Sequence, residues 1–197
     1  MGKGKDEMRI LDVGLDLDGV MYRAFEWDLQ HYCINQLGYD PETLPLPWTR
    51  WDSWREMWGM DEETFLRLCH EATDAGEMFV HGNVEPHAVE VINRLHDAGH
   101  QIHIITARAF GRRSPHNSAD WLHKHGIPFE SLAMVRNKKL MRPDIMLDDH
   151  EYNFADMWSV GVETWLYDQP WNDHVDTEYR VHGWLEFEEV VNRKAEA

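Results

Sequence analysis

Four short polar signatures in this chain carry the residue types that phosphate chemistry requires, and each one follows a hydrophobic run. They are Asp16-Leu17-Asp18-Gly19-Val20, Thr106-Ala107-Arg108, Lys138-Lys139 and Asp148-Asp149. Hydrolysis of a phosphate monoester needs a positioned nucleophile, neutralisation of the phosphoryl oxygens and a proton for the leaving oxygen. Carboxylate, hydroxyl and ammonium groups can supply all three. The four signatures together predict a metal-dependent phosphoryl-transfer site.

The carboxylates of Asp16 and Asp18 can divide the chemical roles between them. One can attack phosphorus to form an aspartyl phosphate, while the other donates and then accepts a proton. Carboxylates ~4 Å apart repel each other by about 4 kcal/mol at an effective dielectric constant near ~20, and Asp148 and Asp149 would add to this repulsion. A divalent cation relieves it, and oxygen ligands favour Mg²⁺. We therefore expect Asp16, Asp18, Asp148 and Asp149 to hold Mg²⁺.

Three residues are candidates for contact with the phosphoryl group itself. The Thr106 hydroxyl and the Ala107 amide can donate hydrogen bonds, and Lys138 offers a positive charge. Lys139 is the alternative to Lys138, because either could be a solvated cation of a loop. Asn153 could orient the acidic pair or cap the helix that follows it.

The elements that must position these residues alternate between strand and helix. Strand-like runs occupy residues 9–17, 101–105, 132–135, 144–147 and 162–167, and helices are expected at 86–98, 118–125 and from 183 onward. This alternation is typical of a parallel α/β sheet. Because the signatures follow strand ends, they should converge on one edge of the sheet, where open α/β folds bind ligands.

Residues 21–81 break this alternation, because they contain three helical patterns and no clear strand. The patterns cover residues 24–37, 49–58 and 62–75, and Asp61 is a candidate N-cap for the third. We therefore expect a core made of residues 1–20 and 82–197. A small helical cap, residues 21–81, is inserted after its first strand.

Composition limits the class of protein and its partners. The chain has 197 residues, 43% of them hydrophobic, which indicates a globular fold. Its formal net charge of −17 argues against long nucleic acids, whose binding rests on several cationic contacts. It has neither a signal-peptide core nor a run of the ~18 apolar residues that a membrane span needs. With only Cys33 and Cys69, we expect a cytoplasmic protein with buried thiols and no membrane partner.

The four signatures resemble the four motifs of the haloacid dehalogenase superfamily. The resemblance implies a Rossmann-like parallel sheet flanked by helices, with Asp16 as the nucleophile. Asp18 points to phosphoryl chemistry, because dehalogenases usually lack an acid at this position whereas phosphatases need it. A cap between the first and second motifs is the type found in small-molecule phosphatases of this superfamily.

More narrowly, the chain resembles the 5′(3′)-deoxyribonucleotidases over roughly residues 12–156. A helix that carries Trp121 follows the second motif, and Arg136-Asn137-Lys138 then precedes a strand that ends in Asp-Asp, as in those enzymes. The chain departs from them at Ala107-Arg108, where they usually carry Ser-Pro. The resemblance implies a nucleoside monophosphate as substrate, and a homodimer is a further expectation.

In these relatives the nucleoside lies between the catalytic edge and aromatic residues of the cap. The candidates for this contact are Phe25, Trp48 and Trp51, since aromatic side chains stack on bases. Tryptophans recur at helical spacing here, however, and such a stripe also predicts the core of the cap. Arg108 and Arg136 are further candidates for substrate contact, although a basic loop could equally pair with surface carboxylates.

The expected activity is that of a phosphoric monoester hydrolase of the 5′-nucleotidase type, working through an aspartyl phosphate on Asp16. Three alternatives stay open. The substrate could be another small ester such as a sugar phosphate, or a polynucleotide end, which Arg108, Arg112 and Arg113 would favour and the net charge opposes. The chain could also be a catalytically silent regulator that binds nucleotides, although the intact Asp16 and Asp18 argue against this.

Overall fold

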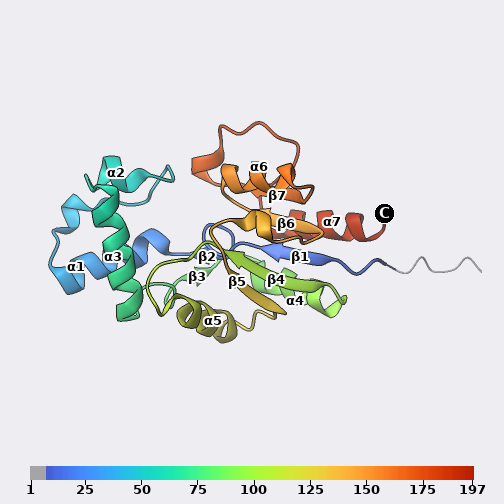
Figure 1. The fold of residues 1–197 in the computed structure, drawn as a ribbon, viewed down its shortest axis with the longest axis horizontal. Helices are drawn as coiled ribbons and strands as arrows, with labels where there is room; N and C mark the ends of the chain where they lie inside the picture. The colour runs from blue at the N-terminus through green and yellow to red at the C-terminus, as the bar shows by residue number, and fades with distance from the viewer. Residues whose placement is uncertain (1–7) are drawn as a thin grey trace, which may run out of the picture.

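A parallel sheet forms the centre of the computed structural model, which describes residues 8–197 (Figure 1). Its six strands lie in the order β5 (Ser131–Met134), β4 (Gln101–Thr106), β1 (Asp12–Leu15), β6 (Ile145–Asp148), β7 (Glu163–Tyr167) and β8 (Arg180–Val181). Every neighbouring pair is parallel. The Rossmann-like α/β fold predicted from the sequence is therefore confirmed. Because β1 lies between β4 and β6, the polar signatures that follow these three strands meet at one edge.

Helices cover both faces of the sheet, as Figure 1 shows. They are α4 (Ala88–Asp97), α5 (Ser114–Lys124), α6 (Glu151–Ser159) and α7 (Trp184–Ala195). Successive residues of a strand point to opposite faces. Ile145 and Leu147 of β6 accordingly pack in the main hydrophobic cluster with α4, α5 and α7, whereas Met146 packs against Met157 of α6.

Three helices precede α4 and form a hydrophobic cluster of their own, separate from the sheet. They are α1 (Phe25–Leu37), α2 (Ser53–Met57) and α3 (Glu62–Ala75), and Figure 1 shows them at one end of the molecule. Cys33 and Cys69 are free, buried thiols within this cluster. A short antiparallel ribbon, β2 (Tyr22–Arg23) with β3 (Asn83–Val84), lies where the two connecting segments run between these helices and the sheet.

The helix boundaries differ from the prediction in two places. The α2 helix begins at Ser53 rather than near residue 49, because Ser53 Oγ accepts hydrogen bonds from the Thr49 and Arg50 amides and forms a turn there. The α5 helix begins at Ser114, before the predicted residue 118, with a proline in its first turn. Asp61 caps α3 as predicted, its side chain accepting from the Thr64 amide at 2.7 Å.

Two-residue strands are too short to show a period, and for that reason β2, β3 and β8 escaped prediction. Residues 1–7, which the prediction counts with the core, lie outside the described residues. Within residues 8–197, no helix combines the length and the apolar character that crossing a bilayer requires.

Candidate active site

Three buried carboxylates meet at the carboxyl ends of β1 and β6. Asp16, Asp148 and Asp149 each offer an oxygen atom, and these atoms all lie within 4.8 Å of one another. Asp148 ends β6, and the Asp16 amide donates to the carbonyl of Leu147 at 3.0 Å, so the chain after β1 stays paired with β6. Parallel pairing of the two strands therefore brings together three of the four predicted metal ligands.

Lys138 lies among these carboxylates. Its Nζ is 2.8 Å from Asp16 Oδ2 and 2.7 Å from Asp148 Oδ2, and the side chain is buried. Burial lowers the pKa of Lys138, but the charges of Asp148 and Asp16 outweigh this and raise it, so the ammonium group keeps its proton. Lys139 instead pairs with Asp156 at 3.0 Å near the surface. Of the two candidate lysines, the structure thus brings Lys138 to the site.

Backbone and amide donors hold the carboxylates in place. The Leu17 amide donates to Asp16 Oδ1 at 2.8 Å. The His150 amide and the Asn153 side chain donate to Asp148 Oδ1 at 2.9 and 3.1 Å. Asn153 therefore orients the acidic pair. Such charge-assisted hydrogen bonds favour one orientation of each carboxylate. Contacts within the protein therefore fix the orientations of Asp16 and Asp148.

The segment between β7 and β8 covers Asp149, although its sequence gave no functional signal. Trp171 Nε1 donates to Asp149 Oδ2 at 3.0 Å, and Asn172 Nδ2 donates to the Asp149 carbonyl at 2.7 Å. Gln169 Nε2 donates to the carbonyl of Gly19 at 2.6 Å. The stretch is irregular and contains no recognisable motif. These three side chains reach the site only through tertiary packing.

The carboxylate triad fits a divalent metal ion. Asp149 Oδ1 is buried and lacks a hydrogen-bond partner among the described residues. Burial, and then the charges of Asp148 and Asp16, raise the pKa of Asp149 well above its usual value. Three carboxylates here face one ammonium group, so a divalent cation would offset the remaining charge and give the unpartnered oxygen a ligand. Carboxylates without thiol or imidazole ligands suit a hard cation.

Asp18 is not among the carboxylates whose oxygens lie within 4.8 Å of one another, so its role as a fourth metal ligand stays a prediction. Both of its oxygens accept from Arg108: Nε donates to Oδ2 and Nη2 donates to Oδ1, each at 2.8 Å. The chain turns sharply after Leu17, whose carbonyl accepts from the amides of Met21 and Tyr22 at 2.8 Å. Burial raises the pKa of Asp18 and the charge of Arg108 opposes this rise. The two aspartates of the first signature thus face different surroundings.

Arg108 lines the cavity described next, and its contact with substrate stays a prediction. Its side chain is fully buried, and its donors reach Asp18 and Ser118. The guanidinium needs such partners because burial removes it from water. Arg112 and Arg113 are exposed and do not line the cavity described next.

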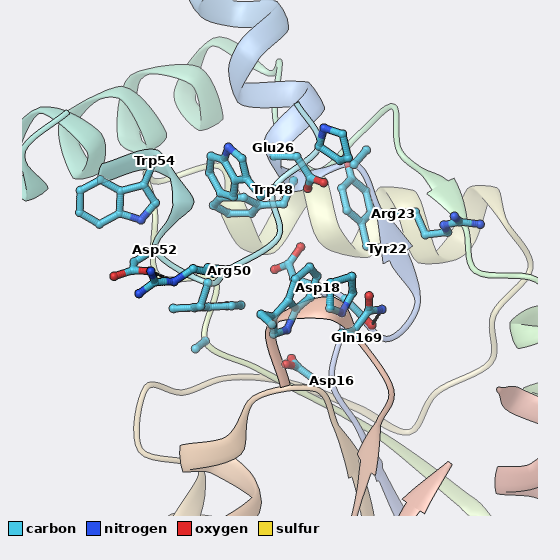
Figure 2. Close-up of a pocket in the computed structure, with 18 of the residues that line it drawn as sticks. Asp16, Asp18, Tyr22, Arg23, Glu26, Trp48, Arg50, Asp52, Trp54 and Gln169 are labelled. Atoms are coloured by element: carbon cyan, nitrogen blue, oxygen red, sulfur yellow. Dashed lines mark hydrogen bonds and ion pairs between the residues drawn. The ribbon is translucent and has the colours of Figure 1, made fainter. Parts of the chain in front are cut away.

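A cavity of about 1060 Å³ opens between the sheet edge and helices α1 to α3. Figure 2 shows Asp16 and Asp18 on one side of it, with Glu26, Trp48 and Trp54 on the other. The residues that line it from the sheet edge include Asp16, Asp18, Gly19, Thr106, Ala107 and Arg108. Lys138, Asp148 and Asp149 are buried and do not line it. A ligand in the cavity thus meets the first and second signatures directly.

The aromatic candidates all line this cavity, but they differ in exposure. Trp48 is buried and packs edge-to-face on Trp58, with ring centroids 5.0 Å apart, so it also belongs to the hydrophobic cluster of α1 to α3. Trp51 is 54% exposed, which leaves ring surface free for a ligand, and its ring meets His150 edge-to-face at 4.5 Å. Phe25 is half-buried among other rings. Arg136 is exposed and is not among the lining residues, so the structure does not bring it to the cavity.

Sequence comparison connects nearly the whole chain to one family. Residues 9–196 match the model of the family described as 5′ nucleotidase, deoxy (Pyrimidine), cytosolic type C protein. The chain is also similar to a curated protein from Chlorobaculum tepidum named "Putative 5′(3′)-deoxyribonucleotidase". The two are 26% identical over 188 residues, which cover 91% of this chain and 89% of the relative.

Solved structures share the fold. One is a HAD-superfamily hydrolase of subfamily IA from Geobacter sulfurreducens, with a TM-score of 0.61 and 18% identity over 92% of this chain and 99% of that chain. Another is described as a predicted phosphatase from Clostridium acetobutylicum, with a TM-score of 0.65 and 16% identity over 93% of this chain and 99% of that chain. At these identities the similarity concerns the fold.

Proposed function

We propose that this chain, which belongs to the 5′ nucleotidase, deoxy (Pyrimidine), cytosolic type C family, hydrolyses nucleoside monophosphates with a preference for deoxyribose forms and depends on Mg²⁺. It is a phosphoric monoester hydrolase of the haloacid dehalogenase superfamily, as its four signatures predict. One observation carries the proposed chemistry. Asp16 and Asp18 both line the cavity, but they have different partners. Asp16 belongs to the carboxylate triad and is bound to Lys138, whereas Asp18 is bound to Arg108.

The first step transfers the phosphoryl group to the protein. A carboxylate oxygen of Asp16 attacks phosphorus, the bond from phosphorus to the ester oxygen breaks, and Asp18 gives its proton to the leaving alcohol. Thr106 and Ala107 both line the cavity, and in this proposal the Thr106 hydroxyl and the Ala107 amide donate to phosphoryl oxygens. Lys138, already 2.8 Å from Asp16, offsets the negative charge that gathers there.

The second step returns the protein to its starting state. A water molecule attacks phosphorus of the aspartyl phosphate, Asp18 accepts a proton from that water, and the bond from phosphorus to Asp16 breaks. Inorganic phosphate leaves, and Asp18 again carries the proton for the next turnover. When bound by Asp16, Asp148 and Asp149, Mg²⁺ would supply positive charge that offsets the repulsion between these carboxylates and a phosphate dianion.

The part of the substrate beyond the phosphate lies against the cap, residues 21–81, in this proposal. Trp51 is the best candidate for stacking on the base, because its ring is more than half exposed at the cavity. Trp48 contributes mainly to the packing that holds the cap together, since it is buried among other rings.

The test is phosphate release from a panel of deoxyribonucleoside and ribonucleoside monophosphates, sugar phosphates and phosphorylated oligonucleotides. Each is measured with Mg²⁺ and with EDTA, and the Asp16→Asn variant is the control for a contaminating phosphatase. We expect Mg²⁺-dependent turnover confined to nucleoside monophosphates, fastest with deoxy forms. Turnover confined to sugar phosphates or oligonucleotides would show that the proposed substrate class is wrong, but it would agree with the proposed mechanism. Undiminished turnover in EDTA would overturn the metal requirement.

A further inference from the structure

Arg108 places a fully buried guanidinium beside the cavity. Its side chain runs from the loop after β4 to Asp18, where Nε and Nη2 donate to the two carboxylate oxygens at 2.8 Å each. A planar guanidinium bound through two parallel hydrogen bonds fixes both the plane and the direction of a carboxylate, which a lysine ammonium does not. Asp18 therefore has one well-defined orientation in this structure.

Arg108 is itself held in place by groups from several elements. Nη1 donates to Ser118 Oγ of α5 at 3.0 Å, and the Arg108 carbonyl accepts from Ser114 Oγ at 2.8 Å. The guanidinium carbon lies 4.5 Å from the ring centre of Tyr22 and 4.2 Å from that of Phe79. Cation–π contacts of this kind stabilise a desolvated arginine. The guanidinium thus has little freedom to move, and Asp18 shares that restriction.

The two rings also connect Arg108 to the cap. Tyr22 and Phe79 lie on the two segments that join α1 and α3 to the sheet, and both bind Asp28 of α1. The Tyr22 hydroxyl donates to Asp28 Oδ2, and the Phe79 amide donates to the same oxygen at 3.1 Å. The orientation of Asp18 is therefore set by a network that reaches the base of the cap as well as the sheet.

We propose that Arg108 is a positioning residue, which holds Asp18 toward the leaving group of the substrate and away from the carboxylate triad. This inference rests on the proposed function, because it assigns proton transfer to Asp18. The Asp18 side chain keeps 17% exposure at the cavity, so it can reach a ligand, whereas the Arg108 side chain has none. Asp18 is only two residues from Asp16, and without its two donors it is free to turn toward Lys138 and the triad.

The test compares two substrates that differ in their need for a proton. Thymidine 5′-monophosphate releases an alcohol, which must be protonated as it leaves, whereas p-nitrophenyl phosphate releases a stable phenolate that needs no proton. Arg108→Lys keeps the charge and loses the paired geometry, and Arg108→Met loses both. Arg112→Met is the matched control, because Arg112 is an exposed arginine of the same loop that does not line the cavity.

For thymidine 5′-monophosphate, we expect kcat to fall about 100-fold in Arg108→Met and about 10-fold in Arg108→Lys, with KM nearly unchanged. For p-nitrophenyl phosphate, the rate of the initial burst of p-nitrophenolate, which reports the first step alone, should change by less than about 3-fold, since that step needs no proton from Asp18. Arg112→Met should match the wild type on both substrates. A loss in the p-nitrophenolate burst as large as the loss on the nucleotide would overturn the proposal. A raised KM with unchanged kcat would also overturn it, because this would indicate direct contact with substrate.

A second measurement keeps the proposal testable if a variant of the buried arginine fails to fold. Ser118→Ala removes the acceptor behind the guanidinium and should give a smaller loss with the same selectivity for the nucleotide. In addition, Arg108→Lys should not lower kcat for thymidine 5′-monophosphate any further when Asp18→Asn is already present, because both substitutions act through the Asp18 carboxyl group. Additive losses would overturn the proposal.

Failure of this inference is distinguishable from failure of the proposed function. If the wild-type protein hydrolyses no nucleotide but releases phosphate from another alkyl monoester, such as glycerol phosphate, the proposed substrate is wrong. The loss of alkyl turnover in the Arg108 variants, compared with the burst rate of p-nitrophenolate, then still decides whether Arg108 positions Asp18.

Discussion

Two regions face each other across one cavity and are built in different ways. One is the sheet edge, and the other is the cap wall, which we define as the lining residues within 21–81. At the edge, Asp16, Asp148 and Asp149 are buried and are bound by protein donors that come from several elements. On the cap wall, Arg50 is exposed and pairs with a near neighbour, Glu56, at 3.1 Å. Exposed pairs of this kind contribute little to stability.

This difference indicates that the two regions have different roles, one in the reaction and the other in the choice of substrate. The carboxylates of the edge sit at strand ends, so moving one of them requires moving the sheet. The cap wall consists of rings and surface pairs within residues 21–81, none of which belongs to β1 or β6. We therefore expect changes at the edge to stop the reaction and changes at the cap wall to alter the choice of substrate.

The largest effect should come from removing the nucleophile at the edge. Asp16→Asn keeps the shape of the side chain but removes the attacking oxygen, so kcat should fall by at least about 10,000-fold. Phosphate release measures this loss, and circular dichroism checks that the variant is folded. A folded variant with residual turnover near that of the wild type would show that Asp16 is not the nucleophile.

The next effect should come from crowding the edge at Gly19. This residue has φ of +71°, and a Cβ there would overlap Asp149 Oδ2 and lie 2.7 Å from Asp149 Cγ. Gly19→Ala should therefore lose stability and weaken the response of Tm to added Mg²⁺. The matched control is Gly38→Ala in the cap, where φ is +74° and a Cβ meets nothing within 4 Å.

Backbone strain alone should cost each glycine variant about 1–2 kcal/mol. Any loss of Mg²⁺ response beyond that of Gly38→Ala is due to the displaced Asp149 carboxylate. Equal behaviour of the two variants would contradict the role given to Asp149.

A smaller and more selective effect should follow from changing the cap wall. Trp51→Ala removes the exposed ring, and we expect KM for nucleoside monophosphates to rise about 10-fold, because stacking on one base contributes about 1–3 kcal/mol. Steady-state kinetics with p-nitrophenyl phosphate, which lacks a base, is the control and should give an unchanged KM. A loss of kcat on both substrates would instead show that the cap wall shapes the reaction itself.

The smallest effect concerns the buried carboxylate at the base of the cap. Burial raises the pKa of Asp28 from its usual 3.8 to about 6, against the hydrogen bonds from Tyr22 and Phe79. The folded state therefore holds this proton more tightly than the unfolded state does. The resulting stability is fully present below the unfolded value and is lost as the pH rises through about 6.

Asp28→Asn removes this titration and keeps an acceptor for Tyr22 and Phe79. Its Tm relative to wild type should therefore rise between about pH 4 and about pH 7, an interval that runs from near the unfolded value of 3.8 to above the folded value of about 6. Thermal unfolding at the two pH values measures the difference. A constant offset between the two proteins would show that Asp28 does not titrate there.

Much of the fold and of the sheet edge could be predicted from the sequence, because strand ends place their polar residues by a simple rule. The runs before Asp16, Thr106 and Asp148 form the neighbouring strands β1, β4 and β6, and their carboxyl ends coincide. For two further residues, one of the two predicted alternatives agrees with the structure. Asn153 binds Asp148 rather than only capping a helix, and Lys138 binds Asp16 rather than lying in a solvated loop. Spacing within and between elements was sufficient for these residues.

Directions of side chains beyond a turn could not be predicted. Asp18 follows Asp16 by two residues, which suggests a shared site, but the turn after Leu17 sends its carboxylate to Arg108. The destination of Arg108 depends in turn on rings that are distant in sequence. Trp171 is a similar case, since only the path of the chain between β7 and β8 brings it to Asp149. These contacts are properties of tertiary packing.

The position of β1 in the sheet has a consequence for how the chain is made. Among the six strands of this sheet it leaves the ribosome first, yet its neighbours β4 and β6 are synthesised only after the whole cap. Until then an apolar segment, whose Leu11, Val13, Leu15 and Leu17 are fully buried in the finished protein, has no partner on either side. Unpaired apolar strands promote aggregation. Nascent or truncated chains that end before Asp148 should therefore depend on chaperones to remain soluble.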